Sequence, residues 1–423
     1  MKLRKYSINL YSFLVCLIGL LAFTYSTIIN SLYAYSSIVL CFFFGSLLLI
    51  KSPSLDKKLV VFMSFFLLPF VIGLLGYPIS MILESDRFDY SQLNFLGRVL
   101  NLFVFYFIIL FINKCTKHGD VYLLFKWYQI GVFILLLTAL WHALSLYTNF
   151  VDWPFETRSK LHSSYGAEYS FGNRVTGIAR EPSFFVMYVV DFIALSLVFF
   201  RGSKRNIIIL FAIILMLLSL SPSGYIVLFF SFVLSLFFCK LKNIKFKTVI
   251  QFLFIFLLLI TVFMYINKSG NQFYEYFFNR IANLDPNESS RLFMLIGPFQ
   301  WVQESNLMSL LLGHGMKSYS IIGTYYTLPS GEPIHITSNN LYIDVFWESG
   351  IVGLIMLAAY FSYIFKKIYF MKIKNKHKFV VLFVFFDLVL SAFFRADYSS
   401  LRFFIILYLL FILTNYDFYK KKL

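Results

Sequence analysis

The chain is a series of long apolar runs separated by short basic segments, and this pattern restricts the fold more than any other feature. Most runs have the length at which a helix spans the hydrocarbon core of a bilayer. With 60% hydrophobic and 13% charged residues, the chain could not bury its apolar surface in one soluble core. The sequence therefore predicts an all-α polytopic membrane protein with about twelve transmembrane helices. The runs lie at about 8–29, 32–50, 59–83, 93–113, 121–148, 182–200, 206–220, 225–239, 248–267, 340–365, 379–395 and 400–416.

The charges between the runs predict which side of the membrane each segment faces. With the N-terminus inside, the inner segments hold most of the 37 lysines and arginines, and their acids are Asp56, Asp120 and Asp417. This distribution obeys the positive-inside rule, so both termini are predicted to be cytoplasmic. The net charge of +17 therefore indicates basic loops and not a nucleic-acid partner. The four cysteines form no CxxC pair, and we interpret them as small apolar side chains.

Two outer segments, at about 149–181 and 268–339, are longer than simple connections. Their aromatic content predicts folded structure at the membrane surface, and an amphipathic helix bent at Pro298 is expected over about 289–304. Ser221-Pro222-Ser223-Gly224 predicts a turn that splits one apolar stretch into a hairpin. The predicted organisation is helices 1–5 over 1–148, a first outer loop over 149–181, helices 6–9 over 182–267, a large outer loop over 268–339 and helices 10–12 over 340–423.

The first candidate functional segment lies where the first outer loop re-enters the membrane. It contains Arg174, Arg180 and Glu181, followed by Pro182, which fits the first turn of a helix. A helix N-terminus with neighbouring arginines is suited to bind an anion. The alternative is that these arginines are interfacial anchors beside an ordinary helix cap.

The second outer loop supplies further candidates. Arg291 lies just after the start of the predicted loop helix, where the alternative is a solvated charge. The turn Gly313-His314-Gly315 could bring backbone close to a ligand.

The second outer loop ends in a third candidate segment. If the tenth helix starts early, His335 and Asn339 share one of its faces. The functional interpretation is a proton acceptor with sugar-binding amides, and the structural alternative is a helix cap and a packing seam. Gly350 and Gly353 would then allow close helix approach.

Several motifs of nucleotide and metal chemistry are not found in the sequence. It contains no HExxH, no P-loop and no Gly-rich nucleotide fingerprint. We therefore expect no nucleotide-sugar donor, no ATP-driven transport, no cofactor and no metal.

At this point a family resemblance emerges. Arg174-x-x-Gly177-x-x-x-Glu181-Pro182 resembles the first-loop motif of the O-antigen polymerase (Wzy) family. The second loop is also similar, with Arg291 early, Gly313-x-Gly315 in the middle, and Asn339-Asn340-Leu-Tyr and Glu348-x-Gly350-x-x-Gly353 at its end. O-antigen ligases share this layout. Many relatives place His immediately before the Asn that opens the helix, whereas this chain has Asn339 there and its nearest His is His335.

The resemblance implies a GT-C-like fold and a metal-independent glycosyltransferase at the outer face of the bacterial plasma (inner) membrane. A glycan would move from undecaprenyl pyrophosphate onto a lipid-linked repeat unit, with a chain-length regulator protein as a further partner. The substrate-binding residues implied are Arg174, Arg180, Arg291, Asn339 and Asn340. The catalytic base would be His335 or Glu181, with His314, substrate-assisted transfer and water-mediated transfer as alternatives.

Two other functions compete with the polymerase. An O-antigen ligase would transfer the same donor to lipid A core. A flippase or transporter of lipid-linked sugars should place its charges within helices, and here Asp191 and Asp387 are the clear cases.

Overall fold

The computed structural model describes residues 10–29, 32–51, 55–90, 95–116, 122–148, 151–155, 174–239, 290–322, 325 and 338–415. Within these residues the regular structure is helical, apart from one isolated β-bridge between Thr27 and Ala179. The helices are α1 (Leu10–Leu21), η1 (Ala22–Ser26), α2 (Leu32–Lys51), α3 (Lys57–Leu83), α4 (Leu96–Thr116), α5 (Leu123–Thr148), α7 (Pro182–Phe199), α8 (Gly202–Leu218), α9 (Pro222–Phe238), α12 (Ser290–Trp301), η5 (Val302–Glu304), α13 (Leu307–Leu312), α14 (Tyr319–Ile322), α15 (Leu341–Tyr369), α16 (Asn375–Ser391) and α17 (Leu401–Asn415).

The predicted apolar runs correspond to helices wherever the structure describes them, and the run at 248–267 lies outside the described residues. Five helices, namely α3, α4, α5, α7 and α15, are long and apolar enough to cross a membrane. Shorter apolar helices accompany them at Leu10–Ser26, Ile38–Lys51, Pro222–Phe238 and Leu401–Asn415. The all-helical, multi-pass character is therefore supported, whereas the total of twelve spans stays a prediction.

Helix α3 shows why lipid is the fitting solvent. Its exposed side chains include Val61, Phe65, Leu68 and Leu75, which recur every three or four residues and so share one face. A soluble protein rarely exposes so large an apolar surface. The other face of α3 is buried and packs along α15.

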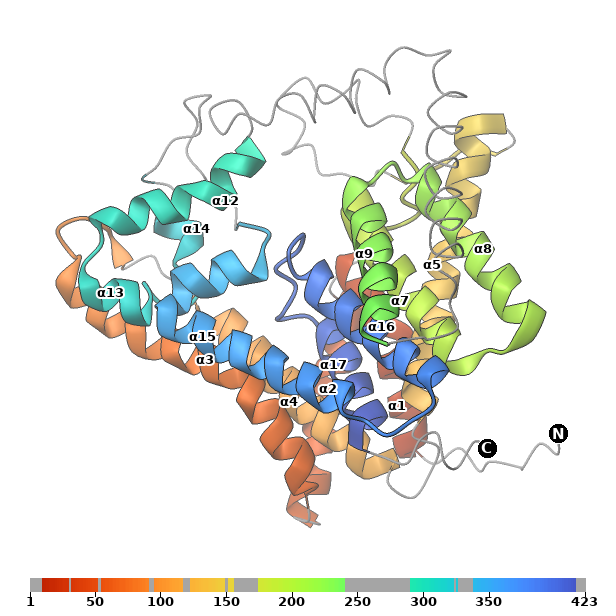
Figure 1. Cartoon of the computed structure of the whole chain (residues 1–423), viewed down its shortest axis with the longest axis horizontal. Coiled ribbons are helices and arrows are strands. Elements are labelled where there is room, and N and C mark those ends of the chain that lie inside the picture. The colour runs from red at the N-terminus through yellow and green to blue at the C-terminus, as the bar shows by residue number, and fades with distance from the viewer. Residues whose placement is uncertain are drawn as a thin grey trace.

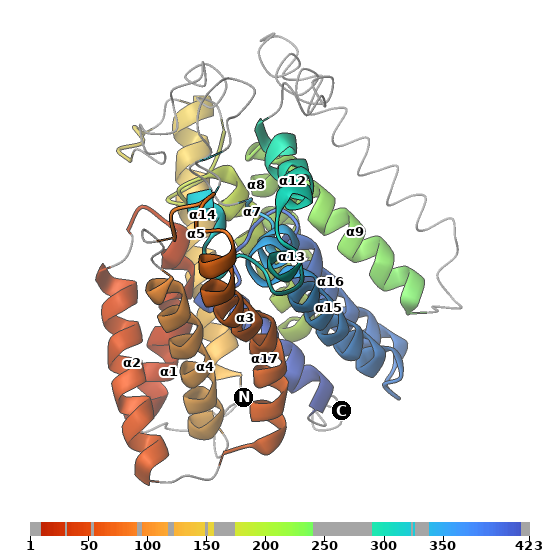
Figure 2. The same ribbon diagram turned by 90° about the vertical axis from the view of Figure 1, so that its left-hand side faces the viewer.

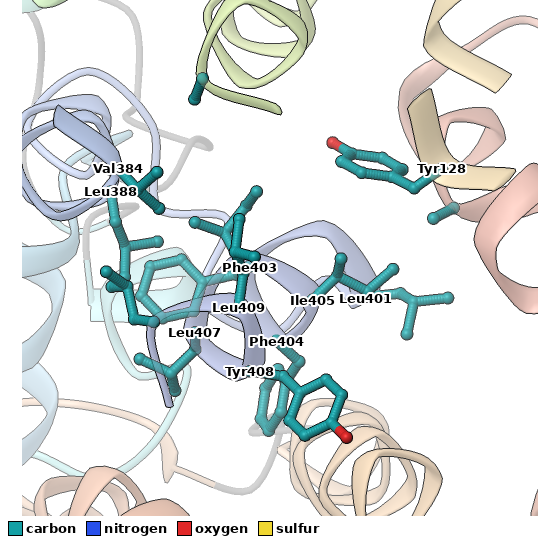
Figure 3. Packing of buried hydrophobic residues seen from close by; sticks show 14 of the residues in the cluster. Tyr128, Val384, Leu388, Leu401, Phe403, Phe404, Ile405, Leu407, Tyr408 and Leu409 are labelled. Atoms are coloured by element: carbon teal, nitrogen blue, oxygen red, sulfur yellow. The ribbon is translucent and has the colours of Figure 1, made fainter. Parts of the chain in front are cut away.

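The bundle is built from pairs of neighbouring helices around a buried centre. Helices α3 and α15 run side by side, α1 packs on α5, and α9 packs on α16 (Figure 1). In α17 every residue from Leu401 to Leu413 is buried. Figure 3 shows its side chains pointing in several directions, with Tyr128 of α5 on one side and Val384 and Leu388 of α16 on the other. A helix that is apolar all round belongs in the core, and α7 is similarly buried from Phe185 to Ser196.

The predicted outer and inner segments lie at different ends of the bundle. Figure 2 shows α12 and α14 towards one end, and the end of α2 with the start of α3 at the opposite end. This arrangement agrees with the predicted separation of the two sets of segments. Which end faces the cytoplasm stays a prediction.

Two local expectations can be compared directly. The predicted turn between the seventh and eighth runs is present, but it lies at Ser219–Leu220, and Pro222 begins α9. Helix α8 packs on α5 and α7 while α9 packs on α16, so the two helices diverge rather than pair (Figure 1). The loop helix is confirmed as α12, which contains Pro298 and continues into η5.

Candidate active site

The main chain that leads into α7 is held against the junction of η1 and α2. The amide of Arg180 donates to the carbonyl oxygen of Ser26 at 3.0 Å, and the amide of Ile28 donates to that of Ile178 at 2.9 Å. The bridge between Thr27 and Ala179 lies between these bonds. This pairing fixes where α7 starts, and the helix begins at Pro182 as predicted, with Glu181 at its N-cap position.

Arg180 is the exposed arginine of this segment. Its Nε atom donates to the carbonyl oxygen of Thr27 at 3.3 Å. Its two terminal nitrogens have no hydrogen-bond partner in the described part of the chain. The guanidinium therefore presents two donor nitrogens and a positive charge at the N-terminal end of α7, where the helix dipole also favours an anion.

Arg174 is buried and is used differently. Its Nε donates to the carbonyl oxygen of Ser219 at 3.1 Å, and its Nη2 donates to that of Leu220 at 2.9 Å. The last carbonyls of a helix lack partners within the helix, so Arg174 satisfies backbone acceptors at the turn between α8 and α9. In this structure the two arginines of the first-loop motif thus contact different elements.

Arg395 joins the first-loop motif to the entrance of α15. It lies in the connection between α16 and α17 and forms an ion pair with Glu181. Its Nη2 also donates to the hydroxyl of Ser183, and its Nη1 donates to Oδ1 of Asn339 at 3.3 Å. The guanidinium lies over the ring of Phe184, 3.8 Å from the centroid. One nearly buried side chain thus contacts two segments that are far apart in the sequence.

The entrance to α15 is shaped by two consecutive asparagines. Asn339 has a positive φ of 56°, a conformation that asparagine tolerates better than most residues. Asn340 is the N-cap, and its Oδ1 accepts from the amides of Tyr342 at 2.9 Å and Ile343 at 3.2 Å. The early start of the tenth helix, on which a shared face of His335 and Asn339 depended, is not seen at Asn339, because the helix begins at Leu341 and left-handed backbone precedes it.

Glu348, the acid of the third motif, is buried in an ion pair with Arg98 of α4. Arg98 Nη1 also donates to the hydroxyl of Tyr398 at 2.6 Å, and that hydroxyl donates to Oε2 of Glu348 at 3.1 Å. Tyr398 lies in the same connection as Arg395. The connection between α16 and α17 therefore contacts two parts of the third motif.

The Gly313-His314-Gly315 turn packs against α15 and not into open space. A Cβ atom at Gly313 would lie 2.3 Å from the backbone of Glu348, and Gly313 has a φ of 82°. Facing it, Gly350 has a φ of 65° and interrupts the helical backbone of α15. The close backbone approach predicted at Gly350 is thus present, whereas the Gly313 turn, for which a ligand was considered as the neighbour, lies against protein backbone.

His314 itself is buried between polar partners. Its Nδ1 lies 3.1 Å from the hydroxyl of Tyr90, and its Nε2 lies 3.1 Å from that of Ser305. The ring stacks on Trp347 with centroids 4.3 Å apart. Burial, aided by the nearby positive charge of Arg87, lowers the pKa of His314 to about 3. The ring is therefore neutral at physiological pH and joins the segment after α3, through Tyr90, to the segment after η5, through Ser305.

For two of the predicted site residues, His335 and Arg291, the structure does not describe the side chain. His335 lies outside the described residues, so its position relative to Glu181 stays a prediction. Arg291 lies on α12 as predicted, but its side chain is outside the described part. The structure thus brings Glu181 and Asn339 onto one partner, places Asn340 in a cap, and leaves the predicted base untested.

Arg395 and Arg98 were not singled out from the sequence. A signal for Arg395 was present, because Arg395-Ala-Asp397-Tyr-Ser-Ser is a polar interruption between the last two apolar runs on the predicted outer side. The predicted run at 379–395 included Arg395 at its end, whereas α16 ends at Ser391. This connection is short, so loop length does not mark it as functional.

Among the residues that the structure describes, no group of three or more His, Cys, Asp or Glu side chains is placed to hold a metal ion. The charges of the candidate site are those of arginines and paired carboxylates. Chemically, such an arrangement suits the recognition of an anionic group.

The fold and the site together define a multi-pass helical membrane protein with a polar junction at one end of its bundle. Residues 207–358 match the model of a family described as O-antigen ligase, Wzy_C. This match covers less than half of the chain and supports the O-antigen ligase and polymerase superfamily without separating ligases from polymerases. A search of curated proteins found no match. The similarity suggests a glycosyltransferase-like ligase or polymerase activity.

Proposed function

We propose that this protein is a polymerase that transfers a growing glycan from undecaprenyl pyrophosphate onto a lipid-linked repeat unit. The observation that carries the proposal is the exposed guanidinium of Arg180 beside the Glu181–Arg395–Asn339 junction. It places available positive charge at the start of a membrane helix. A lipid-bound pyrophosphate would present its charge at such a membrane surface.

The proposed reaction is a substitution at the anomeric carbon of the donor. A hydroxyl of the acceptor sugar forms the new C–O bond, the bond to the pyrophosphate oxygen breaks, and the bonding electrons leave with the pyrophosphate. The proton of the hydroxyl passes to a base, for which His335 and Glu181 are the candidates. Positive charge near the leaving group stabilises the charge that develops there.

Glu181 has a defined structural task in addition to its candidacy as the base. It forms the ion pair with Arg395 and accepts from the hydroxyl of Ser183 at 3.1 Å. In this structure the partner of Glu181 in the ion pair is Arg395 of the connection between α16 and α17. These contacts favour His335 as the residue to test first for proton transfer.

A deletion strain separates the proposal from its nearest rival. The family description is that of a ligase, so transfer of the glycan to lipid A core is the second candidate function. Surface glycan run on a gel should collapse to single repeats if a polymerase is lost. Absence of any surface-attached glycan would instead indicate a ligase and contradict the proposal.

Arg180 provides the residue-level test. We expect Arg180→Gln to abolish long chains and Arg180→Lys to restore them only in part, because an ammonium lacks the planar fork of a guanidinium. The matched control is Arg205→Gln, which changes a partly exposed arginine that hydrogen-bonds the neighbouring Asn206. Full chain length in both Arg180 variants, at normal membrane abundance, would remove Arg180 from the site.

A further inference from the structure

Arg395 is the described residue at which the first-loop motif and the entrance of α15 meet. It contacts Glu181 and Ser183 at the start of α7 through Nη2, and Asn339 through Nη1. Both terminal nitrogens are therefore engaged by protein groups. The side chain is 10% exposed, which distinguishes it from the exposed Arg180.

The surroundings of Arg395 also fix its orientation. The guanidinium lies on the ring of Phe184, which restricts it from one side. The connection that carries it is tied to α15 by a bond from the amide of Leu341 to the carbonyl oxygen of Ala392, at 2.9 Å. The planar, forked shape of a guanidinium allows it to hold partners in two directions, which an ammonium does less well.

We propose that Arg395 is a positioning residue that holds the Arg180–Glu181 segment and the Asn339 segment at the separation required for glycan transfer. It acts through Glu181 and Asn339 and does not itself contact the substrate. This inference rests on the proposed function for its catalytic consequence. Its structural part concerns only how the two segments are held together.

The geometry predicts which substitutions matter. Arg395→Met keeps an unbranched chain over Phe184 but removes the contacts to both segments. Because a misplacement of about 1 Å can cost on the order of 100-fold in rate, we expect kcat for chain extension to fall about 100-fold, with a smaller change in KM. Arg395→Lys can keep the ion pair with Glu181 and should recover part of the loss.

The matched control is Arg87→Gln. Arg87 also pairs with a glutamate, Glu304, and joins the end of α3 to η5 on the same predicted outer side. If any lost ion pair at this end impaired the protein, Arg87→Gln would lower kcat as strongly as Arg395→Met. The proposal expects near-normal kcat for Arg87→Gln.

The experiment combines kinetics with hydrogen exchange on the full-length protein in detergent. We expect Arg395→Met to speed amide exchange at 181–185 and 338–341, with no such change in Arg87→Gln. We also expect the double variant Arg395→Met, Glu181→Gln to lose no more kcat than the worse single variant. Each single change already breaks the ion pair between Arg395 and Glu181. Unchanged exchange at both segments, or additive kinetic losses with a raised KM, would overturn the positioning role.

The two proposals fail in different ways. If the wild-type protein does not extend lipid-linked repeat units, the proposed function fails, while the exchange measurement still decides whether Arg395 joins the two segments. If the wild type is active but exchange is unaffected in Arg395→Met, the proposed function stands and the positioning role is overturned.

Discussion

Three arginines near the candidate site have different environments in the folded chain. Arg174 is buried on the carbonyls of the α8–α9 turn, Arg180 is exposed, and Arg395 joins two segments. A guanidinium whose donors are held by protein acceptors has fewer left for a ligand. Burial and partners, more than residue type, therefore make Arg180 the preferred candidate for contact with an anionic substrate.

The burial of His314 predicts that the stability of the folded protein depends on pH. Its pKa is lowered to about 3 in the folded protein, whereas the unfolded chain titrates near 6.5. The unfolded state therefore binds the proton first, and stability falls as pH drops from about 6.5 towards 3. From this group alone we expect a loss of about 2 kcal/mol between pH 7.5 and pH 5.

Thermal melting of the purified protein at both pH values measures this effect. His314→Gln cannot titrate in this range, so its melting temperature should depend less on pH than that of the wild type. An equal pH dependence in the two proteins would show that other groups are responsible.

At the scale of elements, the contact between the Gly313 turn and α15 depends on the lack of side chains. Gly313→Ala would place a Cβ atom against the backbone of Glu348 at a position of positive φ. We expect a loss of about 3 kcal/mol in the free energy of unfolding. The control is Gly97→Ala on α4, where no atom lies within 4 Å of the added Cβ, and helix propensity should leave stability unchanged or up to about 1 kcal/mol higher. Similar melting temperatures for the two variants would contradict this interpretation of the turn.

Helices α7, α16 and α17 share a buried charged cluster in the core. Asp191 accepts from Arg402 through both carboxylate oxygens, at 2.7 and 2.9 Å. Asp387 is fully buried, and neither of its oxygens has a hydrogen-bond donor among the described residues. The two carboxyl groups are therefore expected to contribute differently to the stability of the folded protein, although both are aspartates in apolar helices.

Substitution by asparagine should affect stability differently at Asp191 and at Asp387. Asp191→Asn removes one of the two carboxylates that pair with Arg402, the other being Asp397, and is expected to cost about 3 kcal/mol. Asp387→Asn removes a carboxyl without a donor and supplies an amide that can donate, so stability should be unchanged or higher. Detergent-solubilised melting curves provide the comparison, and a larger loss for Asp387→Asn would contradict it.

The prediction for the whole molecule is its orientation. Reporter fusions after Lys57, Lys204 and Lys374 should behave as cytoplasmic, and a fusion after Asp152 as external, because the basic segments remain inside. The polar junction around Arg395 would then face outward, where the lipid-linked sugars are proposed to react. A cytoplasmic signal at Asp152 would contradict both the topology and the proposed function.

Most of the helices could be predicted because a chain in lipid must satisfy its backbone polar groups locally. That requirement links apolar run length directly to helix length, as in α3, α5 and α15. Helix ends were predicted where a local signal exists, as at Pro182. They were less accurate at α16, where apolar residues beyond Ser391 continue outside the helix.

The sequence by itself determined the helical, membrane-embedded architecture, the start of α7 and the residue types available for anion recognition, since each depends on nearby residues and the solvent. Only the tertiary structure decided that Arg395 contacts Glu181, that Arg174 holds a helix turn, and that the Gly313 turn packs on α15. These are contacts between residues far apart in the chain. Their geometry depends on how the helices pack, which local patterns do not specify.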